Sequence, residues 1–208
     1  MTEKHESPSG GVCAILMASG FSKRFGDTNK LLASFRGKPL ARHTLDLVCG
    51  LDCFSRIIFA AAEDPVLALA GGLPVTAVRN EHPERGQRES IRLGLEANPA
   101  AEWYMFFPCD QPLLNAAVVR RVVAARRPGH IVLPCCRGEP GNPVLFSGLF
   151  RDELLTLGQG ERGRDIIRRH SESLIRLEIA PIPGLPFPGS PLTDIDDPRT
   201  LARLEGAG

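Results

Sequence analysis

The amino-acid sequence predicts an α/β fold, in which helices flank a mostly parallel sheet within a single domain. Two observations indicate this class. Short apolar runs of strand length alternate with segments that repeat apolar residues at helical spacing along most of the 208 residues. The first run, residues 12–17, is apolar throughout and follows two glycines, as expected of a strand buried on both faces. The chain should therefore form a Rossmann-like sheet with ligand groups at the carboxyl ends of its strands.

The first half of the chain shows the alternation clearly. Between residues 39 and 48 apolar side chains recur at helical spacing, so a helix is expected there. The run RIIFAA, residues 56–61, predicts a second buried strand. Asp64 and Pro65 then begin a short helix, with the aspartate as its cap and the proline at its first position. A third, short strand is expected at residues 74–78.

The second half continues the pattern. After a loop that ends at Gly86, Ile91, Gly94 and Leu95 share one face of a helix expected at residues 88–97. The apolar run at 103–107 predicts the fourth strand. The remaining expected elements are helices at 118–125, 149–157, 162–170 and 198–204, strands at 130–134 and 174–179, and a short apolar segment at 143–146.

Composition and charge limit the classes of function. The chain is 43% apolar and 24% charged with a formal net charge of +1, which gives no reason to expect nucleic acid or a membrane surface as a partner. No apolar run approaches the ~18 residues of a membrane span, and the polar start does not resemble a signal peptide, so a cytoplasmic location is expected. Residues 1–11 are expected to be a disordered lead, and residues 12–208 one domain.

The six cysteines carry no metal or disulfide pattern. No two are spaced C-x-x-C, so neither a zinc site nor a disulfide framework is expected. The adjacent Cys135 and Cys136 are expected to be reduced thiols near a strand end, buried or inert, with a redox role as the alternative.

The turn after the first strand combines small residues with cations. Ala18, Ser19 and Gly20 are small enough for backbone to approach a ligand closely, and Arg24 and Lys30 follow. Backbone N–H groups with spaced cations form a cradle for a polyphosphate. The glycine spacing fits neither the P-loop nor the dinucleotide fingerprint. The alternative is a polar connection whose cations face solvent.

This turn also resembles the signature of a known family. The pattern M-A-S-G-x-S-x-R-F-G at 17–26, followed by K-L-L at 30–32 and G-K-P-L at 37–40, is similar to that of the MobA-like nucleotidyltransferases. The resemblance implies a nucleotide-diphospho-sugar transferase-like fold and an enzyme that binds a nucleoside triphosphate and transfers its nucleotidyl group. It also implies that residues 18–20 bind the nucleotide and that Arg24 and Lys30 act on the triphosphate.

Asp110 is the strongest single candidate for chemistry. It follows the strand at 103–107, which places it at the ligand edge of the sheet, although an aspartate that caps the next helix is the alternative. Asp110, Gln111 and Pro112 resemble the D-Q-P-x-L motif of the molybdenum cofactor cytidylyltransferases, the branch that the sequence resembles most. The resemblance implies that Asp110 is catalytic and holds Mg²⁺, which prefers one or two carboxylates together with phosphate oxygens.

Two further aspartates lie near the end of the chain. Asp194 and Asp196 alternate along an extended segment, so their carboxylates should share a face. The family has D-I-D-T-P at this point, which implies that one of the two completes the metal site, and Asp194 is the first choice. Asp197 is expected to cap the helix that begins at Pro198.

Three other segments resemble family motifs. Gly86 and Ser90 match the segment that contacts base and ribose, although Glu89 stands where the family often has serine. Residues 160–164 are similar to a G-D-x-G-A/x-R segment. The acceptor-side motif G-x-P-V-L-F is matched from its first residues, Gly141, Asn142 and Pro143. An ordinary helix start and glycine turns are the alternatives.

Together these motifs imply transfer of CMP from CTP to the terminal phosphate of a molybdopterin-type cofactor, with release of pyrophosphate and Mg²⁺ as cofactor. CTP is expected over GTP because Ser19 is closer in bulk to the alanine of cytidylyltransferases than to the glycine of guanylyltransferases. The alternatives are a guanylyltransferase, a nucleotidyltransferase for another phosphorylated small molecule, and a carrier of molybdenum cofactor without chemistry. A recipient molybdoenzyme or its chaperone is a further expected partner.

Overall fold

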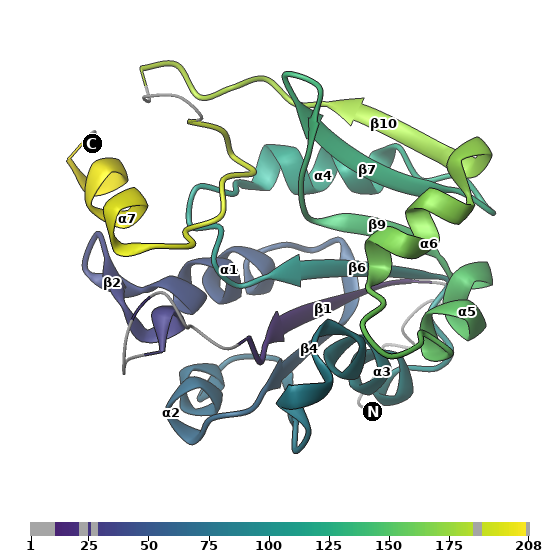
Figure 1. The fold of residues 1–208 in the computed structure, drawn as a ribbon, viewed down its shortest axis with the longest axis horizontal. Helices are drawn as coiled ribbons and strands as arrows, with labels where there is room; N and C mark the ends of the chain where they lie inside the picture. The colour runs from purple at the N-terminus through teal and green to yellow at the C-terminus, as the bar shows by residue number, and fades with distance from the viewer. Residues whose placement is uncertain (1–10, 21–24, 26–28, 185–188, 207–208) are drawn as a thin grey trace, which may run out of the picture.

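The computed structural model describes residues 11–20, 25, 29–184 and 189–206 (Figure 1). It contains an eight-stranded sheet in which seven strands follow the order β10-β7-β9-β6-β1-β4-β5, with β8 paired to β7. The predicted lead, residues 1–11, lies outside the described residues except for Gly11. The predicted α/β fold with a mostly parallel sheet flanked by helices is confirmed.

The first strand, β1 (Val12–Ala18), lies inside the sheet between β4 and β6 and runs parallel to both. Its wholly apolar sequence suits this position, because both of its faces are covered by helices. The other strands are β4 (Phe54–Ala61), β5 (Thr76–Arg79), β6 (Trp103–Pro108), β7 (Ile131–Cys136), β8 (Glu139–Pro140), β9 (Val144–Ser147) and β10 (Leu174–Glu178). The predicted strands are therefore confirmed, with shifted ends.

Two short strands, β8 and β9, run against the rest of the sheet. β9 pairs with β6 so that Val144 lies opposite Phe106. Because β9 enters the sheet at the carboxyl end of β6, residues 141–143 lie at that same edge. The sequence predicts an apolar segment here, but its antiparallel direction depends on pairing partners far away in the chain.

Helices cover both faces of the sheet (Figure 1). Successive side chains of β1 alternate between two cores, since strand side chains have a period of two. Ala14 and Leu16 belong to one core and Cys13 and Ile15 to the other. The first core includes buried residues of α1 (Leu40–Cys49), α2 (Asp64–Leu67) and α4 (Ala116–Ala124), and the second those of α3 (Gln87–Ala97), α5 (Arg151–Leu155) and α6 (Gly163–Arg169).

A third, smaller core fixes the end of the chain. Leu204 of α7 (Pro198–Glu205) and Ile195 are buried together with Leu113, which follows β6. Asp197 caps α7 as predicted, because its Oδ1 accepts a hydrogen bond from the Thr200 N–H at 2.8 Å. This core holds the C-terminal segment beside the turn that carries Asp110.

Local differences from the predictions have identifiable causes. The helix expected at 149–157 is shorter than predicted: α5 spans only Arg151–Leu155, and a 3-10 turn, Gly148–Phe150, precedes it. The prediction that Asp64 caps α2 is wrong: Glu63 is the cap residue and Asp64 is the first helical residue. An unpredicted hairpin joins β2 (Ser34–Phe35) to β3 (Lys38–Pro39). Within the described residues, no helix is both long and apolar enough to cross a membrane.

Gly94 lets α3 approach β1 closely. A Cβ at this position would lie 2.4 Å from Ile15 Cγ2. Gly94→Ala is therefore expected to lower the free energy of unfolding by about 1–3 kcal/mol from overpacking, despite the ~1 kcal/mol that alanine contributes to helix propensity. Urea denaturation measures this loss. In an Ile15→Ala background the same change should cost less, and an equal cost in both backgrounds would contradict the contact.

Candidate active site

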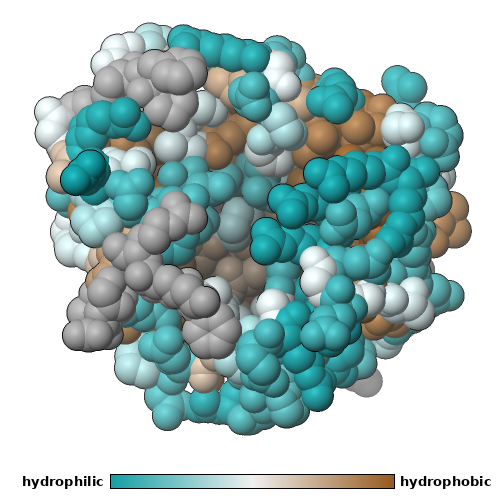
Figure 2. Space-filling model, in the orientation of Figure 1, coloured by the Kyte–Doolittle hydropathy of each residue, from teal (hydrophilic) through white to brown (hydrophobic). Residues whose placement is uncertain are grey.

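A cleft of about 690 Å³ opens at the carboxyl edge of the sheet. Its walls come from the ends of β1 and β6, the 3-10 turn Pro83–Arg85 with the start of α3, and residues 159–162. Figure 2 shows a mostly hydrophilic face with a hollow near its middle, in the region where Figure 1 places the ends of β1 and β6. Parallel α/β sheets place their ligands at this edge.

Lys30, Asp110 and Asp196 form an ion-pair cluster at the cleft. The Lys30 ammonium donates to Asp110 Oδ2 at 2.5 Å, to Asp196 Oδ1 at 3.0 Å and to the Ile195 carbonyl at 3.3 Å. The side chains of Lys30 and Asp110 are only 15% and 14% exposed, so solvent screens this pair weakly. Burial disfavours the charged ammonium, but the two carboxylates outweigh it, and the pKa of Lys30 is raised. Lys30 is thus a fixed cation at neutral pH.

Gln111 joins the Asp110 turn to the C-terminal segment. Its buried side chain donates from Nε2 to the Leu192 carbonyl at 3.0 Å and to Asp194 Oδ1 at 2.8 Å. In addition, the Ile195 N–H donates to the Asp110 carbonyl at 2.9 Å. These bonds bring the two predicted acidic segments together. In the sequence, Gln111 stands out only as part of a family motif, and nothing there indicates that it anchors Asp194.

The carboxylates here offer oxygens that suit a divalent cation. Asp110 Oδ1 is buried and has no hydrogen-bond partner within the described part of the chain. Burial of the carboxyl beside Gln111, and then the charge of Asp110, raise the pKa of Asp194 above its usual range, even though the residue as a whole keeps an exposed surface.

No three or more His, Cys, Asp or Glu side chains in the described ranges are grouped as a metal site. Mg²⁺ needs only one or two carboxylates when phosphate oxygens complete its shell. The residues present therefore fit a Mg²⁺ ion that arrives with a nucleotide. The choice between Asp194 and Asp196 stays a prediction.

Two small residues after β1, Ser19 and Gly20, line the cleft, where a ligand could come close to the backbone. Ser19 is 9% exposed and its hydroxyl donates to the Ala60 carbonyl of β4 at 3.2 Å. Gly20 is exposed and lines the cleft with Ser19, and both also border an adjoining cavity of about 270 Å³ together with Ala18. Arg24, predicted to bind the triphosphate, lies outside the described residues.

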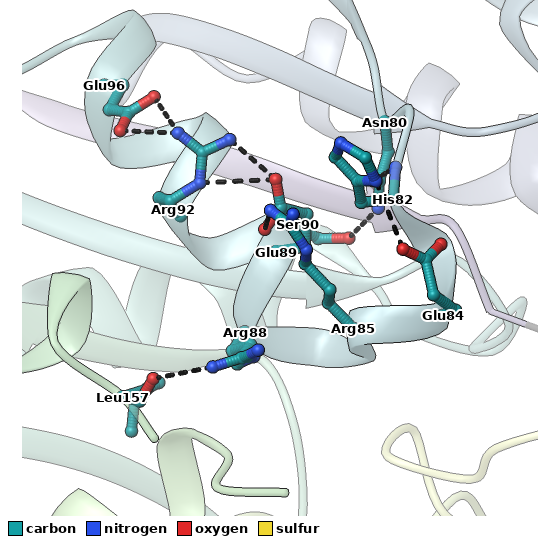
Figure 3. Close-up of polar contacts among 10 residues, drawn as sticks. All are labelled: Asn80, His82, Glu84, Arg85, Arg88, Glu89, Ser90, Arg92, Glu96 and Leu157. Carbon is teal, nitrogen blue, oxygen red and sulfur yellow. Dashed lines mark hydrogen bonds and ion pairs between the residues drawn. The ribbon is translucent and has the colours of Figure 1, made fainter. Parts of the chain in front are cut away.

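Gly86 and Ser90 line the cleft at the start of α3. Gly86 has a φ of 73°, in the left-handed region that favours glycine, and it links the 3-10 turn to the helix. Ser90 is buried, and its hydroxyl accepts from Asn80 Nδ2 at 3.5 Å (Figure 3). Asn80 Oδ1 in turn accepts from the His82 N–H at 2.9 Å. Buried Asn80 supports this wall, a role that its sequence position does not indicate.

The predicted acceptor residues, Gly141, Asn142 and Pro143, lie at the same edge of the sheet but are not among the residues that line the cleft. Gly141 packs against the C-terminal segment, because a Cβ there would lie 2.7 Å from the Leu192 Cβ. Close packing is therefore one reason for glycine at this point of the motif. Its acceptor role stays a prediction.

Residues 159–162 form a wall that the sequence marks only by similarity to a family segment. Gly160 has a φ of 81°. Glu161 Oε2 accepts from the Gly158 N–H at 2.6 Å, and the Glu161 carboxylate also pairs with Arg169 of α6. Arg169 further pairs with Glu153 of α5 at 3.1 Å. This loop is thus tied to two helices behind it.

The cysteines give no sign of nucleophilic chemistry. All six are free, and Cys135 and Cys136 are buried at the end of β7, as predicted. Cys109 lines the cleft, but burial raises its pKa well above the usual value. Because the thiolate is the reactive form, Cys109 is poorly suited to attack a substrate.

Glu89 forms a buried ion pair where the family often has serine. Its side chain is 4% exposed and lies 2.6 Å from Arg92 and 3.5 Å from Arg85. The hydrogen bond from Arg92 holds the pKa of Glu89 below its usual value, against the opposing effect of burial. Because the pKa of Glu89 is lower in the folded than in the unfolded state, its charge stabilises the fold at pH values above the unfolded-state pKa. This stabilisation is lost as the pH falls through the folded-state pKa.

Glu89→Gln is therefore expected to lower the free energy of unfolding by about 1–3 kcal/mol at pH 7. The difference should shrink as the pH falls below the ordinary glutamate value of 4.5. Urea denaturation between pH 3 and 7 measures it, with Glu96→Gln, a more exposed partner of Arg92, as the control. A loss that is constant across this range would show that charge at Glu89 does not stabilise the fold.

Known proteins resemble the chain in sequence and in fold. The model of the MobA-like NTP transferase domain matches residues 14–174. A molybdenum cofactor guanylyltransferase of Vibrio cholerae is 28% identical over 71% of this chain and 72% of its own length. Its counterpart in Vibrio atlanticus is 30% identical over 76% of this chain and 79% of its own length. A nucleotidyl transferase of Methanothermobacter thermautotroptrophicus shares the fold, with a TM-score of 0.78 and 20% identity over 94% of this chain and 96% of that one.

Proposed function

Because this chain belongs to the MobA-like NTP transferase domain family, we propose that it transfers a nucleotidyl group from a nucleoside triphosphate to the terminal phosphate of molybdenum cofactor. The observation that carries this proposal is the pairing of Lys30 with Asp110 at a cleft where β1 and β6 end. One group supplies a cation for a triphosphate, and the other a carboxylate for a divalent ion. The acceptor is proposed from the relatives, which are named molybdenum cofactor guanylyltransferases.

The proposed reaction needs no protein nucleophile. A terminal phosphate oxygen of the acceptor attacks the α-phosphorus of the nucleotide, a new P–O bond forms, and the bond to the departing pyrophosphate breaks. The chain contributes position and charge. Lys30 offsets the charge on the triphosphate from a partly buried site, where screening is weak. Arg24 is proposed as a second cation on the strength of its place in the motif.

Mg²⁺ is the proposed cofactor, held by Asp110 and by one of Asp194 and Asp196. When bound, it supplies charge neutralisation of the triphosphate. The unpartnered Oδ1 of Asp110 within the described structure supports the first ligand. Lys30 balances Asp110 and Asp196, which otherwise repel each other, so the pair is held ready for the incoming nucleotide.

CTP is the proposed donor, with GTP as the second candidate. Ser19 fills space beside the cleft that a glycine would leave open, and its hydroxyl is engaged by the Ala60 carbonyl. This bulk favours the smaller pyrimidine base. The observation in favour of GTP is that both Vibrio relatives are named guanylyltransferases. A recipient molybdoenzyme or its chaperone is proposed to take up the product.

Titration calorimetry with CTP, GTP, ATP and UTP, each with and without Mg²⁺, tests the nucleotide half of the proposal. Binding that needs Mg²⁺ and is tightest for CTP is the expected result. Tightest binding of GTP would assign guanylyl transfer in its place. Failure to bind any of the four, with and without molybdenum cofactor present, would contradict a transferase. Binding of the cofactor alone, independent of Mg²⁺, would favour a carrier.

A further inference from the structure

We propose that Arg88 and Arg162 form a cationic wall that binds the anionic phosphate group of the second substrate. This inference rests on the proposed function, because a second, phosphorylated substrate must enter the cleft. Both arginines line the cleft that also contains Lys30 and Asp110. Both lie inside segments that resemble family motifs, but at positions where those motifs leave the residue open.

The buried Glu89 pairs with the two arginines near Arg88, and not with Arg88 itself. Arg92 lies 2.6 Å from Glu89 and 2.5 Å from Glu96, and Arg85 lies 3.5 Å from Glu89. Figure 3 shows Arg92 directed at these two carboxylates, whereas Arg88 extends away from them toward Leu157. Glu89 therefore engages the two neighbouring arginines, and among the described residues no carboxylate compensates the charge of Arg88.

Arg88 has little to hold its guanidinium in the structure as described. Its one hydrogen bond there is a long contact of 3.4 Å to the Leu157 carbonyl, and its Nε is buried without a partner. No carboxylate in the described ranges pairs with it. Burying a donor of an arginine without a partner is unfavourable, so a bound anion would remove a cost that the free protein carries.

Arg162 lines the same cleft, from the loop at residues 159–162. It is exposed, it precedes α6, and it ends the loop whose start, at Leu157, contacts Arg88. Its backbone N–H donates to Asp165 at 2.8 Å, but in the described chain no carboxylate pairs with its guanidinium. The tie between Glu161 and Arg169 fixes this loop, so Arg162 is presented from a held position.

The chemistry of the reaction indicates which substrate this wall serves. Base and ribose are neutral, and the charge of the nucleotide lies on its triphosphate, which Lys30 and Asp110 with Mg²⁺ are proposed to bind. Attack by a phosphate group brings a second anion next to that triphosphate, and like charges repel unless cations separate them. The guanidinium group of arginine forms bidentate hydrogen bonds with phosphate oxygens. Arg88 and Arg162 supply such groups on a different wall.

The test uses the full chain with Arg88→Met, Arg162→Met and the double variant. Arg168→Met is the matched control, since Arg168 is on α6, is exposed and pairs with Asp165 away from the cleft lining. Each single change should raise the KM for molybdenum cofactor about tenfold or more, as expected for a lost charge-assisted hydrogen bond. The Kd for CTP with Mg²⁺ should stay within about twofold. The control should change neither constant.

A second readout uses inorganic phosphate as the probe, titrated into protein saturated with Mg²⁺ and a non-hydrolysable CTP analogue. Wild-type protein should bind phosphate, and the double variant should bind it at least about tenfold more weakly. If the variants transferred the nucleotidyl group with an unchanged KM for the cofactor, the proposed role of Arg88 and Arg162 would be overturned, while the proposed function would stand. An equal rise in the Kd for CTP would also overturn this role, by assigning the arginines to the nucleotide. Arginine-dependent phosphate binding without transfer to the cofactor would uphold the wall and contradict the proposed acceptor. If the protein showed no transfer to the cofactor and no arginine-dependent phosphate binding, both the proposed function and the phosphate-binding role of the two arginines would be contradicted.

Discussion

Asp110→Asn is expected to reduce nucleotidyl transfer by about 10²–10³-fold while the protein stays folded. Asparagine keeps the shape of the side chain but removes the charge that pairs with Lys30 at 2.5 Å and that would hold a cation. The unpartnered Oδ1 makes this loss specific, because within the described residues no other group uses that oxygen. Initial rates at saturating nucleotide and Mg²⁺ measure the effect, and circular dichroism checks the fold.

The matched control for this change is Asp52→Asn, since the Asp52 side chain is 92% exposed and lies outside the cleft lining. Its rate should equal that of the unmodified protein. If Asp110→Asn kept more than about a third of the activity, Asp110 would be a structural residue of the turn and would not take part in the reaction.

Lys30→Met is expected to weaken nucleotide binding by about 10–100-fold and to lower the transfer rate as well. A hydrogen bond to a charged group contributes about 1.5–3 kcal/mol, which corresponds to this range of binding. The change also leaves Asp110 and Asp196 without the ammonium that lies between them. Their uncompensated negative charge should then repel the triphosphate and weaken its binding further. Titration with CTP and Mg²⁺ separates the binding loss from the rate loss.

Lys38→Met is the control for this second change, because Lys38 is 53% exposed and pairs with Asp46 on α1. It should bind nucleotide as the unmodified chain does. Equal affinity in Lys30→Met and Lys38→Met would contradict a role for Lys30 on the triphosphate and would leave it as a structural counter-ion of Asp110.

The elements with a strong local pattern could be predicted from the sequence. The apolar run of β1 indicates a doubly buried strand, and that is where the structure places it. The cap of α7 at Asp197 follows from an aspartate before a proline. Asp110 and Lys30 both follow buried strands, which predicts that they share one edge of the sheet, and they lie in contact.

The features that sequence reasoning missed depend on contacts between distant segments. The antiparallel direction of β9 is set by β6 and β7, and no residue within β9 encodes it. Gln111 reaches Asp194 only because the third core folds the C-terminal segment back. Arg85 and Arg92 pair with Glu89 whereas Arg88 does not, and this difference depends on which residues of α3 are buried. Helical spacing alone gives too little information for that.

Nucleotidyl transfer is tested most directly by turnover of the purified protein with molybdenum cofactor, Mg²⁺ and CTP or GTP, followed by mass spectrometry of the cofactor. Nucleotidyl transfer at this cleft predicts a cofactor heavier by one nucleotidyl group, one pyrophosphate released per product, a preference for CTP, and loss of both products in Asp110→Asn. A cofactor of unchanged mass with both nucleotides, from protein that binds both substrates, would contradict nucleotidyl transfer as the function of this cleft.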